Sequence, residues 1–284
     1  MSVINTNVSA LYSQNALTKN ARVQSSTMEQ LSTGNRVNSA KDDAAGLAIG
    51  QNMTAQVRGL NQAVRNANDA INMLQTAEGA MVEQSNMLQR MRELAVQASN
   101  ATYSSTQLGY LNTEFQALST QIDKIATQTT WNGQTLLAAS TTAFTYQTGI
   151  NSGQTITVSI AGTGNSYLGL ASSYNTAGGT VTTGQALITT QTTAMNAITA
   201  LDSAIDNINS ARATLGATIN RMTYATDNMT NIASNVTASR STIMDTDYAT
   251  ASTQLSKTQI ISQAATAMLA QANQQPQSVL SLLK

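Results

Sequence analysis

Two segments of this chain, one in each half, repeat apolar residues at steps of three and four positions. The first repeat consists of Met53, Val57, Leu60, Val64, Ala67, Ile71, Leu74, Met81, Leu88 and Met91. The second consists of Ile198, Leu201, Ile205, Ile208, Leu215, Ile219, Met222 and Met229. This spacing places apolar side chains on one stripe of a helix, and a sustained seven-residue period is typical of a coiled coil. The pattern predicts two long helices that pack against other helices.

Polar and glycine-containing stretches divide the chain into further elements. Helices are expected over about residues 1–31, 44–99, 185–236 and 248–284. A shorter helix is expected between a break at residues 100–105 and a turn at residues 131–133, with its apolar face over residues 108–125. Polar breaks at residues 32–43 and 238–247 separate the outer helices from the long ones. The chain is therefore nearly symmetric end to end, with an outer and a long helix in each half.

The middle of the chain has a different pattern. Residues 143–148 and 155–160 alternate apolar and polar side chains, which is typical of strands. We expect a β-hairpin in which Phe144 and Tyr146 share one face, followed by loops rich in Gly, Ser and Thr. Together they form a β-hairpin and loop region over residues 140–184.

These elements predict a mainly α fold, in which the N- and C-terminal segments form a long antiparallel coiled-coil or helical-bundle rod with a small β-hairpin region inserted in its middle. We expect a terminal helical domain of residues 1–43 and 244–284, and a rod domain of residues 44–243. The terminal pair is poor in charge and finds no other partner within the chain. Because isolated helices are marginal in water, this pair is either disordered in the monomer or buried between copies.

Composition narrows the possible functions. The chain has no cysteine and no histidine, which excludes disulfides, thiolate nucleophiles, Cys or His metal sites and His-based acid–base catalysis. Charged residues make up 10% of the chain, against roughly 25% in ordinary soluble proteins, and the two signs balance. No basic stripe offers a surface for nucleic acid. We therefore expect no cofactor, no metal and no nucleic acid partner.

Neither the first residues nor the hydropathy of the chain predicts a secretory signal peptide or a membrane-spanning segment. The sequence MSVINTNVSAL lacks the basic and apolar regions of a secretory signal peptide, and no run approaches the roughly 18 apolar residues of a membrane span. Membrane insertion is not expected, and a chain of this kind is either cytosolic or exported by a route that composition does not show.

Two carboxylate pairs and one Ser-Lys pair suggest catalysis only at first sight. Asp42 with Asp43, and Asp245 with Asp247, lie at expected helix boundaries, where acidic side chains cap free N–H groups. Adjacent residues on a helix point in different directions, so Ser256 and Lys257 do not form a dyad. We expect no enzyme activity.

Three stretches resemble one known family. They are Ser39 to Ile49 (SAKDDAAGLAI), Gln89 to Gln97 (QRMRELAVQ) and the C-terminal segment from Leu269 to Leu283. These residues resemble bacterial flagellin over about residues 1–137 and 194–284. The chain departs from the family pattern at its last residue, Lys284, where arginine is more usual, and at Gln275, which replaces an apolar residue.

The resemblance implies a structural subunit that polymerises with itself into the extracellular flagellar filament for motility. It also implies export as an unfolded chain by the flagellar type III apparatus, which would explain a secreted product without a signal peptide. The implied partners are further copies of the chain, an export chaperone, and the cap and hook-associated proteins. The central region of about 45 residues is short, so this is expected to be a flagellin without large outer domains, and its loops over 140–184 are a candidate region for glycosylation at Ser or Thr.

The resemblance also supplies candidate site residues. Gln89, Arg90, Leu94 and Glu114 match the segment that binds the innate-immune Toll-like receptor for flagellin. Arg90 offers a planar five-donor fork and Leu94 an expected exposed apolar side chain, a plausible anchor pair. The alternative is that these four residues pack between filament subunits, and both roles can hold. Candidate filament-core residues are Ile4, Val8, Leu11, Leu255, Ile261, Met268, Val279, Leu280, Leu282 and Leu283, and the last four also resemble a segment read by cytosolic inflammasome receptors.

Three other classes fit the sequence less well. A hook–filament junction protein shares the terminal helices, but its match at residues 89–97 and in the tail would be poorer. A type III translocator would need a terminal helix with a basic face and aromatic anchors, which residues 248–284 lack. An enzyme would have almost no catalytic side chains to use.

Overall fold

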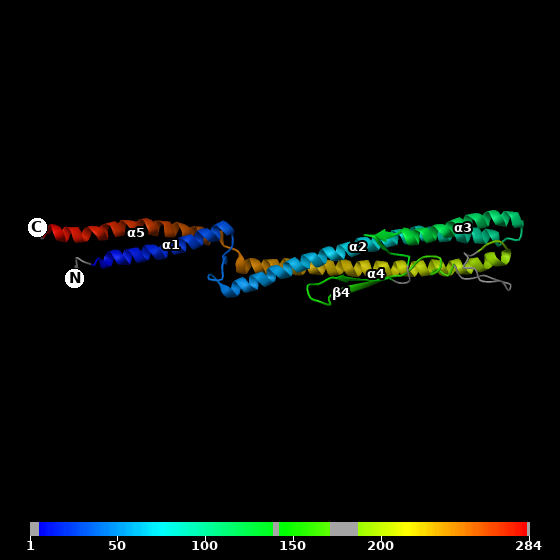
Figure 1. Cartoon of the computed structure of the whole chain (residues 1–284), viewed down its shortest axis with the longest axis horizontal. Helices are drawn as coiled ribbons and strands as arrows, with labels where there is room; N and C mark the ends of the chain where they lie inside the picture. The colour runs from blue at the N-terminus through cyan, green and yellow to red at the C-terminus, as the bar shows by residue number, and fades with distance from the viewer. Residues whose placement is uncertain (1–5, 139–141, 171–186, 283–284) are drawn as a thin grey trace. The chain divides into compact units, whose positions relative to one another are not determined.

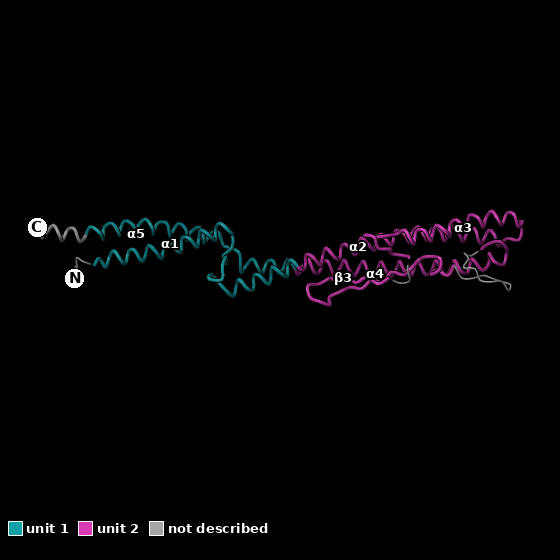
Figure 2. The backbone as a smooth tube through the Cα atoms, viewed as in Figure 1, with its two compact units in different colours: residues 1–58, 233–284 teal, residues 59–232 magenta. Residues whose placement is uncertain are grey.

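A computed structural model of the chain describes residues 6–138, 142–170 and 187–282, with side chains in the last helix described as far as residue 274. The chain has two compact units, one made of residues 1–58 and 233–284 and the other of residues 59–232 (Figure 2). The described elements, in chain order (Figure 1), are helices and strands α1 (Val8–Thr33), α2 (Ala44–Ala98), α3 (Ser105–Gln128), β1 (Thr130–Trp131), β2 (Gln134–Thr135), β3 (Thr142–Gln147), β4 (Thr155–Ile160), α4 (Gln191–Met244) and α5 (Tyr248–Leu282).

The expected fold class is confirmed, because long helices dominate and the described strands form two small antiparallel pairs. The expected bounds of α2 and α5 are close to those observed. The expected bounds of α4 were wrong at both ends, since it begins at Gln191 rather than near 185 and continues to Met244 rather than stopping near 236.

The late end of α4 has a cause outside the helix. The last carbonyls of a helix have no donor within it and need a partner. Arg36 supplies that partner from the segment between α1 and α2, since its guanidinium Nη2 donates to the carbonyl of Ile243 at 2.7 Å and its backbone N–H donates to the carbonyl of Met244 at 2.6 Å. A cation at this end also complements the helix dipole. The polar residues after 236 therefore remain helical.

Acidic side chains cap α2 and α5, as expected, and a serine caps α3. Asp43 Oδ1 accepts from the N–H of Gly46 at 2.9 Å at the start of α2, and Asp247 Oδ1 accepts from the N–H of Ala249 at 2.9 Å at the start of α5. Ser104 and Gln107 form a capping box at α3. Asp42 instead accepts from the Ser39 hydroxyl, and this bond lowers the pKa of its carboxyl. These contacts confirm that Asp43 and Asp247 are capping residues.

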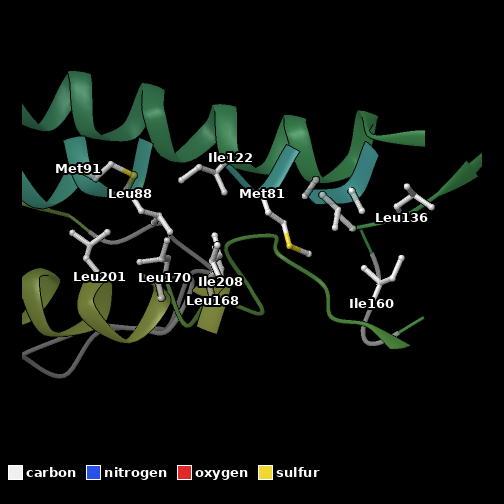
Figure 3. Close-up of a cluster of buried hydrophobic side chains, with 14 of the residues drawn as sticks. Met81, Leu88, Met91, Ile122, Leu136, Ile160, Leu168, Leu170, Leu201 and Ile208 are labelled. Carbon is white, nitrogen blue, oxygen red and sulfur yellow. The ribbon is translucent and has the colours of Figure 1, made fainter. Parts of the chain in front are cut away.

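The second unit contains the main hydrophobic core (Figure 3). The two apolar repeats supply much of it. Their fully or nearly fully buried members are Leu60, Ala67, Leu74, Met81, Leu88, Met91, Leu201, Ile208, Leu215, Met222 and Met229. Phe115 and Ile122 of α3 complete the packing with no exposed surface. Three helices therefore share one interior, and the two long ones pack against other helices as their spacing predicts.

The expected hairpin is also observed. Strands β3 and β4 pair antiparallel with Phe144 opposite Val158 and Tyr146 opposite Ile156. Phe144 and Tyr146 are half-buried while the residue between them is exposed, which confirms that they share a face. The Tyr146 hydroxyl donates to the Sδ of Met73 on α2 at 2.8 Å, and burial raises the pKa of this tyrosine. The hairpin is thereby attached to the helical core.

The loop after β4 is anchored by one buried asparagine. Asn165 is 3% exposed, and its Nδ2 donates to the carbonyl and the hydroxyl of Ser119 at 2.9 and 2.8 Å. Its backbone N–H donates to Asp123 Oδ1 at 2.7 Å. These bonds hold the loop on α3, so that Leu168 and Leu170 fill the core between the helices. Part of the region expected to carry glycosylation, residues 171–184, lies outside the described residues.

Candidate interaction surfaces

Helices α1 and α5 of the first unit lie side by side and antiparallel (Figure 1). Their less exposed residues recur with the three-four spacing of a coiled coil, which defines an inner seam. The inner seam consists of Ala10, Ser13, Leu17, Asn20, Gln24, Thr27 and Leu31 on α1, and of Ala251, Leu255, Thr258, Ser262, Ala265, Leu269 and Ala272 on α5. Small and polar side chains dominate it, so the two helices share little apolar surface.

Apart from the four leucines of the inner seam, most large apolar side chains of this pair are exposed. Those named as filament-core candidates are exposed, with Val8 at 48%, Leu11 at 52%, Ile261 at 41% and Met268 at 64%, while Leu255 is half-buried in the seam. Val23, Met28 and Ile260 are exposed as well. Among the large apolar side chains of α1, Leu17 and Leu31 are the ones that reach the seam.

The burial of the two helices shows how little holds this pair together. Along α1 the buried side chain is Thr27, and along the described side chains of α5 the buried ones are Ala251 and Thr258. Roughly 25 cal/mol is gained per Å² of apolar surface removed from water, so such a seam contributes little stability. The outward-facing apolar surface of α1 and α5 is the part of the first unit with the most to gain from a partner.

The remaining core candidates cannot be placed in this surface. Ile4 and Leu283 lie outside the described residues. Val279, Leu280 and Leu282 lie in the last turns of α5, where the described part of the chain includes the backbone only.

A second surface surrounds Arg90 on the outside of α2. Arg90 donates to Glu93 on its own helix at 3.0 Å and to Glu114 on α3, with Nη2 2.9 Å from Glu114 Oε1. These bonds raise the pKa of Arg90, the one to Glu93 having the larger effect. The side chains of Arg90 and Glu114 are 50% and 47% exposed. Gln89 is exposed beside them, so these three candidates lie on one accessible surface.

Leu94 does not belong to this surface. It was expected to be an exposed apolar side chain, but it is 1% exposed and part of the core cluster. The spacing of apolar residues is enough to predict this burial, because Leu94 follows Met91 by three positions and continues the buried stripe of α2. The apolar side chain that is exposed here is Val96, at 47%, beside Arg92 and Glu93. Arg92 also binds Asp202 of α4 at 2.6 Å, and this bond raises its pKa.

Neither surface has the chemistry of an active site. Among the residues that the structure describes, no three His, Cys, Asp or Glu side chains gather in a way that could hold a metal ion. Across the same residues, no helix carries the run of apolar side chains that a membrane crossing requires. The two surfaces instead offer exposed apolar side chains and fixed charges, which are the features of contacts between proteins.

Comparison with known proteins also indicates a protein that forms contacts with other proteins. Residues 4–142 match the family model described as the bacterial flagellin N-terminal helical region, and residues 198–283 match the bacterial flagellin C-terminal helical region. The chain is 41% identical over 282 residues to flagellin of Halalkalibacterium halodurans, covering 99% of this chain and 100% of that one. It is 43% identical over 311 residues to flagellin of Xenorhabdus nematophila, covering 100% and 99%.

Among solved structures, the fold is similar to a putative flagellar hook-associated protein from Vibrio parahaemolyticus, with a TM-score of 0.57 and 14% identity over 71% of this chain and 99% of that chain. At that identity the likeness shows the fold alone. Sequence identity over the full length, with both terminal helical regions matched in order, is to flagellins. The exposed apolar surface of α1 and α5 is thus found in a chain that belongs to the bacterial flagellin family, whose members form the extracellular flagellar filament.

Proposed function

We propose that this structural subunit of the flagellar filament polymerises through its terminal helical domain, residues 1–43 and 244–284, which is disordered in the monomer and folds on assembly, while residues 44–243 fold alone. The proposal is supported by the exposure of most large apolar side chains on α1 and α5. Burying one large apolar side chain contributes about 1.5–3 kcal/mol, so a ring of neighbouring copies can supply the stability that the inner seam lacks.

The low charge of the terminal helices supports the same proposal. Over residues 6–33 and 248–274 the described charged side chains are Lys19, Arg22, Glu29 and Lys257. Few charges need to lose water when copies pack around these helices, and the repulsion between copies is small. Folding coupled to assembly also makes the ordered state depend on protein concentration.

A domain that stays unfolded until assembly suits export as an unfolded chain. We assign export to the flagellar type III apparatus, with an export chaperone before transit and the cap and hook-associated proteins at the growing filament. The support is the weak inner seam, because a pair of helices with little buried apolar surface opens at low cost.

Hydrogen exchange tests the division into two domains. In the purified monomer, backbone amides of α1 and α5 are expected to exchange at nearly the unfolded rate, while those of α2, α3 and the first part of α4 stay protected. In the polymer, the amides of α1 and α5 should become protected. Strong protection of α1 and α5 in the monomer at low protein concentration would contradict coupled folding and assembly.

We further propose that Gln89, Arg90 and Glu114 form part of a surface for the host Toll-like flagellin receptor. The support is the accessible Arg90 guanidinium, which two carboxylates hold in place. Arg90→Ala is expected to weaken binding of the monomer to the receptor ectodomain by at least about tenfold. The matched control is Arg65→Ala on the same helix, where the guanidinium bonds only to Gln62 in the described structure. Equal binding of both variants would exclude this role for Arg90.

A further inference from the structure

Asn7 lies at the open end of the pair formed by α1 and α5, and its side-chain amide makes two different hydrogen bonds. Its Oδ1 accepts from the backbone N–H of Ala10 at 3.0 Å and caps the N-terminus of α1. Its Nδ2 donates to the carbonyl oxygen of Ala272 in α5 at 2.7 Å. A primary amide has a separate donor and acceptor for these two roles, whereas an ionised carboxylate has only acceptors.

The Ala272 carbonyl differs from its neighbours in α5 because the residue four positions later is Pro276, the single proline of the chain. In an α-helix each carbonyl accepts from the N–H of the residue four positions later. Proline has no amide hydrogen, so the Ala272 carbonyl receives no helical hydrogen bond from that position. Asn7 therefore donates to the carbonyl that Pro276 leaves without its usual partner.

A second asparagine shows that the contact at Asn7 fits one alignment of the two helices. Asn20 Nδ2 donates to the carbonyl oxygen of Thr258 at 2.7 Å. From Asn7 to Asn20 the chain advances 13 residues along α1, and from Thr258 to Ala272 it advances 14 along α5, as two antiparallel helices in one register require (20 − 7 and 272 − 258). Both contacts thus belong to the same antiparallel register.

The inner seam by itself specifies that register poorly. If α1 slid along α5 by one heptad, small side chains such as Ala, Ser and Thr would contact a similar surface. Asn20 would also find an equivalent backbone carbonyl in the shifted register. Residue 262, four positions after Thr258, is a serine with an N–H to donate, so the Thr258 carbonyl is not distinctive. The Ala272 carbonyl is distinctive, because no other residue of α5 is followed four positions later by proline. A buried polar residue with one good partner is a known way to fix the register of a coiled coil.

We infer that Asn7 is a register-determining residue for polymerisation, because its bond to the Ala272 carbonyl, left free by Pro276, fixes the alignment of α1 on α5. That alignment fixes the relative positions of the outward-facing apolar side chains on the two helices. Neighbouring copies bind the surface that these side chains form, so polymerisation requires one alignment. The inference rests on the proposed role of the terminal pair in polymerisation.

A substitution that keeps the cap but removes the donor separates this role from simple capping. Asn and Asp are nearly equivalent at the N-cap position, so a role in capping alone predicts that Asn7→Asp polymerises like the unmodified chain. Loss of the bond to an otherwise unpaired carbonyl predicts a critical concentration for seeded polymerisation about tenfold higher for Asn7→Asp. An unchanged critical concentration would overturn the inference.

The same substitution in a Pro276→Ala chain provides the matched control. Alanine restores the N–H four positions after Ala272, so Asn7→Asp is expected to raise the critical concentration there by less than about twofold. An equal increase in both backgrounds would overturn the link to Pro276. Polymerisation of the unmodified chain is measured in parallel, since its failure would count against the proposed function. Normal polymerisation of the chain and of its Asn7→Asp variant would count against this inference alone.

Discussion

Removal of residues 248–284 is expected to abolish polymerisation completely while leaving the second unit folded. The deletion removes α5 and with it every inner-seam contact of α1, together with the outward-facing apolar surface that α5 contributes. It leaves the core built from α2, α3 and α4 untouched, because the buried members of that cluster lie between Ala70 and Met222. The measurement is seeded polymerisation followed by light scattering, with thermal unfolding of the truncated monomer followed by circular dichroism.

The truncated chain should unfold at nearly the same temperature as the intact monomer, with one cooperative transition. The intact chain, purified in the same way and mixed with the same seeds, is the control for polymerisation. Elongation of seeds by the truncated chain would show that α5 is not needed. A collapse of the unfolding temperature would instead show that residues 44–243 do not fold alone.

Leu94→Ala is expected to lower the free energy of unfolding by about 2–5 kcal/mol, the usual cost of truncating a buried leucine. Leu94 is 1% exposed and belongs to the core cluster that includes Met91 and Leu88. Val96→Ala, two residues further on the same helix, is the matched control, because Val96 is 47% exposed. A substitution at such a position usually changes stability by less than about 0.5 kcal/mol. Urea unfolding of the two monomers measures the difference.

This comparison bears directly on the candidate receptor surface. If Leu94→Ala destabilises the second unit, then any loss of receptor binding by that variant is explained by folding rather than by a lost contact. Arg90→Ala removes a half-exposed side chain and should leave the unfolding curve in place. Equal stability of the Leu94 and Val96 variants would mean that Leu94 is not a core residue, and it would restore Leu94 as a contact candidate.

The sequence was most informative where both partners of a contact belong to the same chain. The repeats that include Leu74 and Met81 on α2 and Ile208 on α4 meet in one core, so their spacing was enough to predict their burial. The alternation in 143–148 and 155–160 likewise predicted the hairpin and the shared face of Phe144 and Tyr146. In both cases periodicity and packing lead to the same surface.

The sequence was least informative at α1 and at the end of α4. The sequence does not show whether the apolar side chains of Val8, Leu11 and Met28 have α5 or another copy as their partner. In this fold they are exposed, and α5 contacts the seam of mostly small and polar side chains instead. The end of α4 depends on Arg36, which is 207 residues from Ile243 in the sequence. The residues around position 244 therefore do not by themselves predict where α4 ends.

Electron microscopy of the intact purified chain shows whether the chain polymerises through its terminal helices. The chain is concentrated, seeded with sheared fragments of its own polymer or salted out, and imaged in negative stain, with the chain lacking residues 248–284 prepared in parallel. We expect long helical filaments from the intact chain and none from the truncated one. The absence of filaments from the intact chain under every seeding condition, or filaments from both chains, would contradict the proposed function.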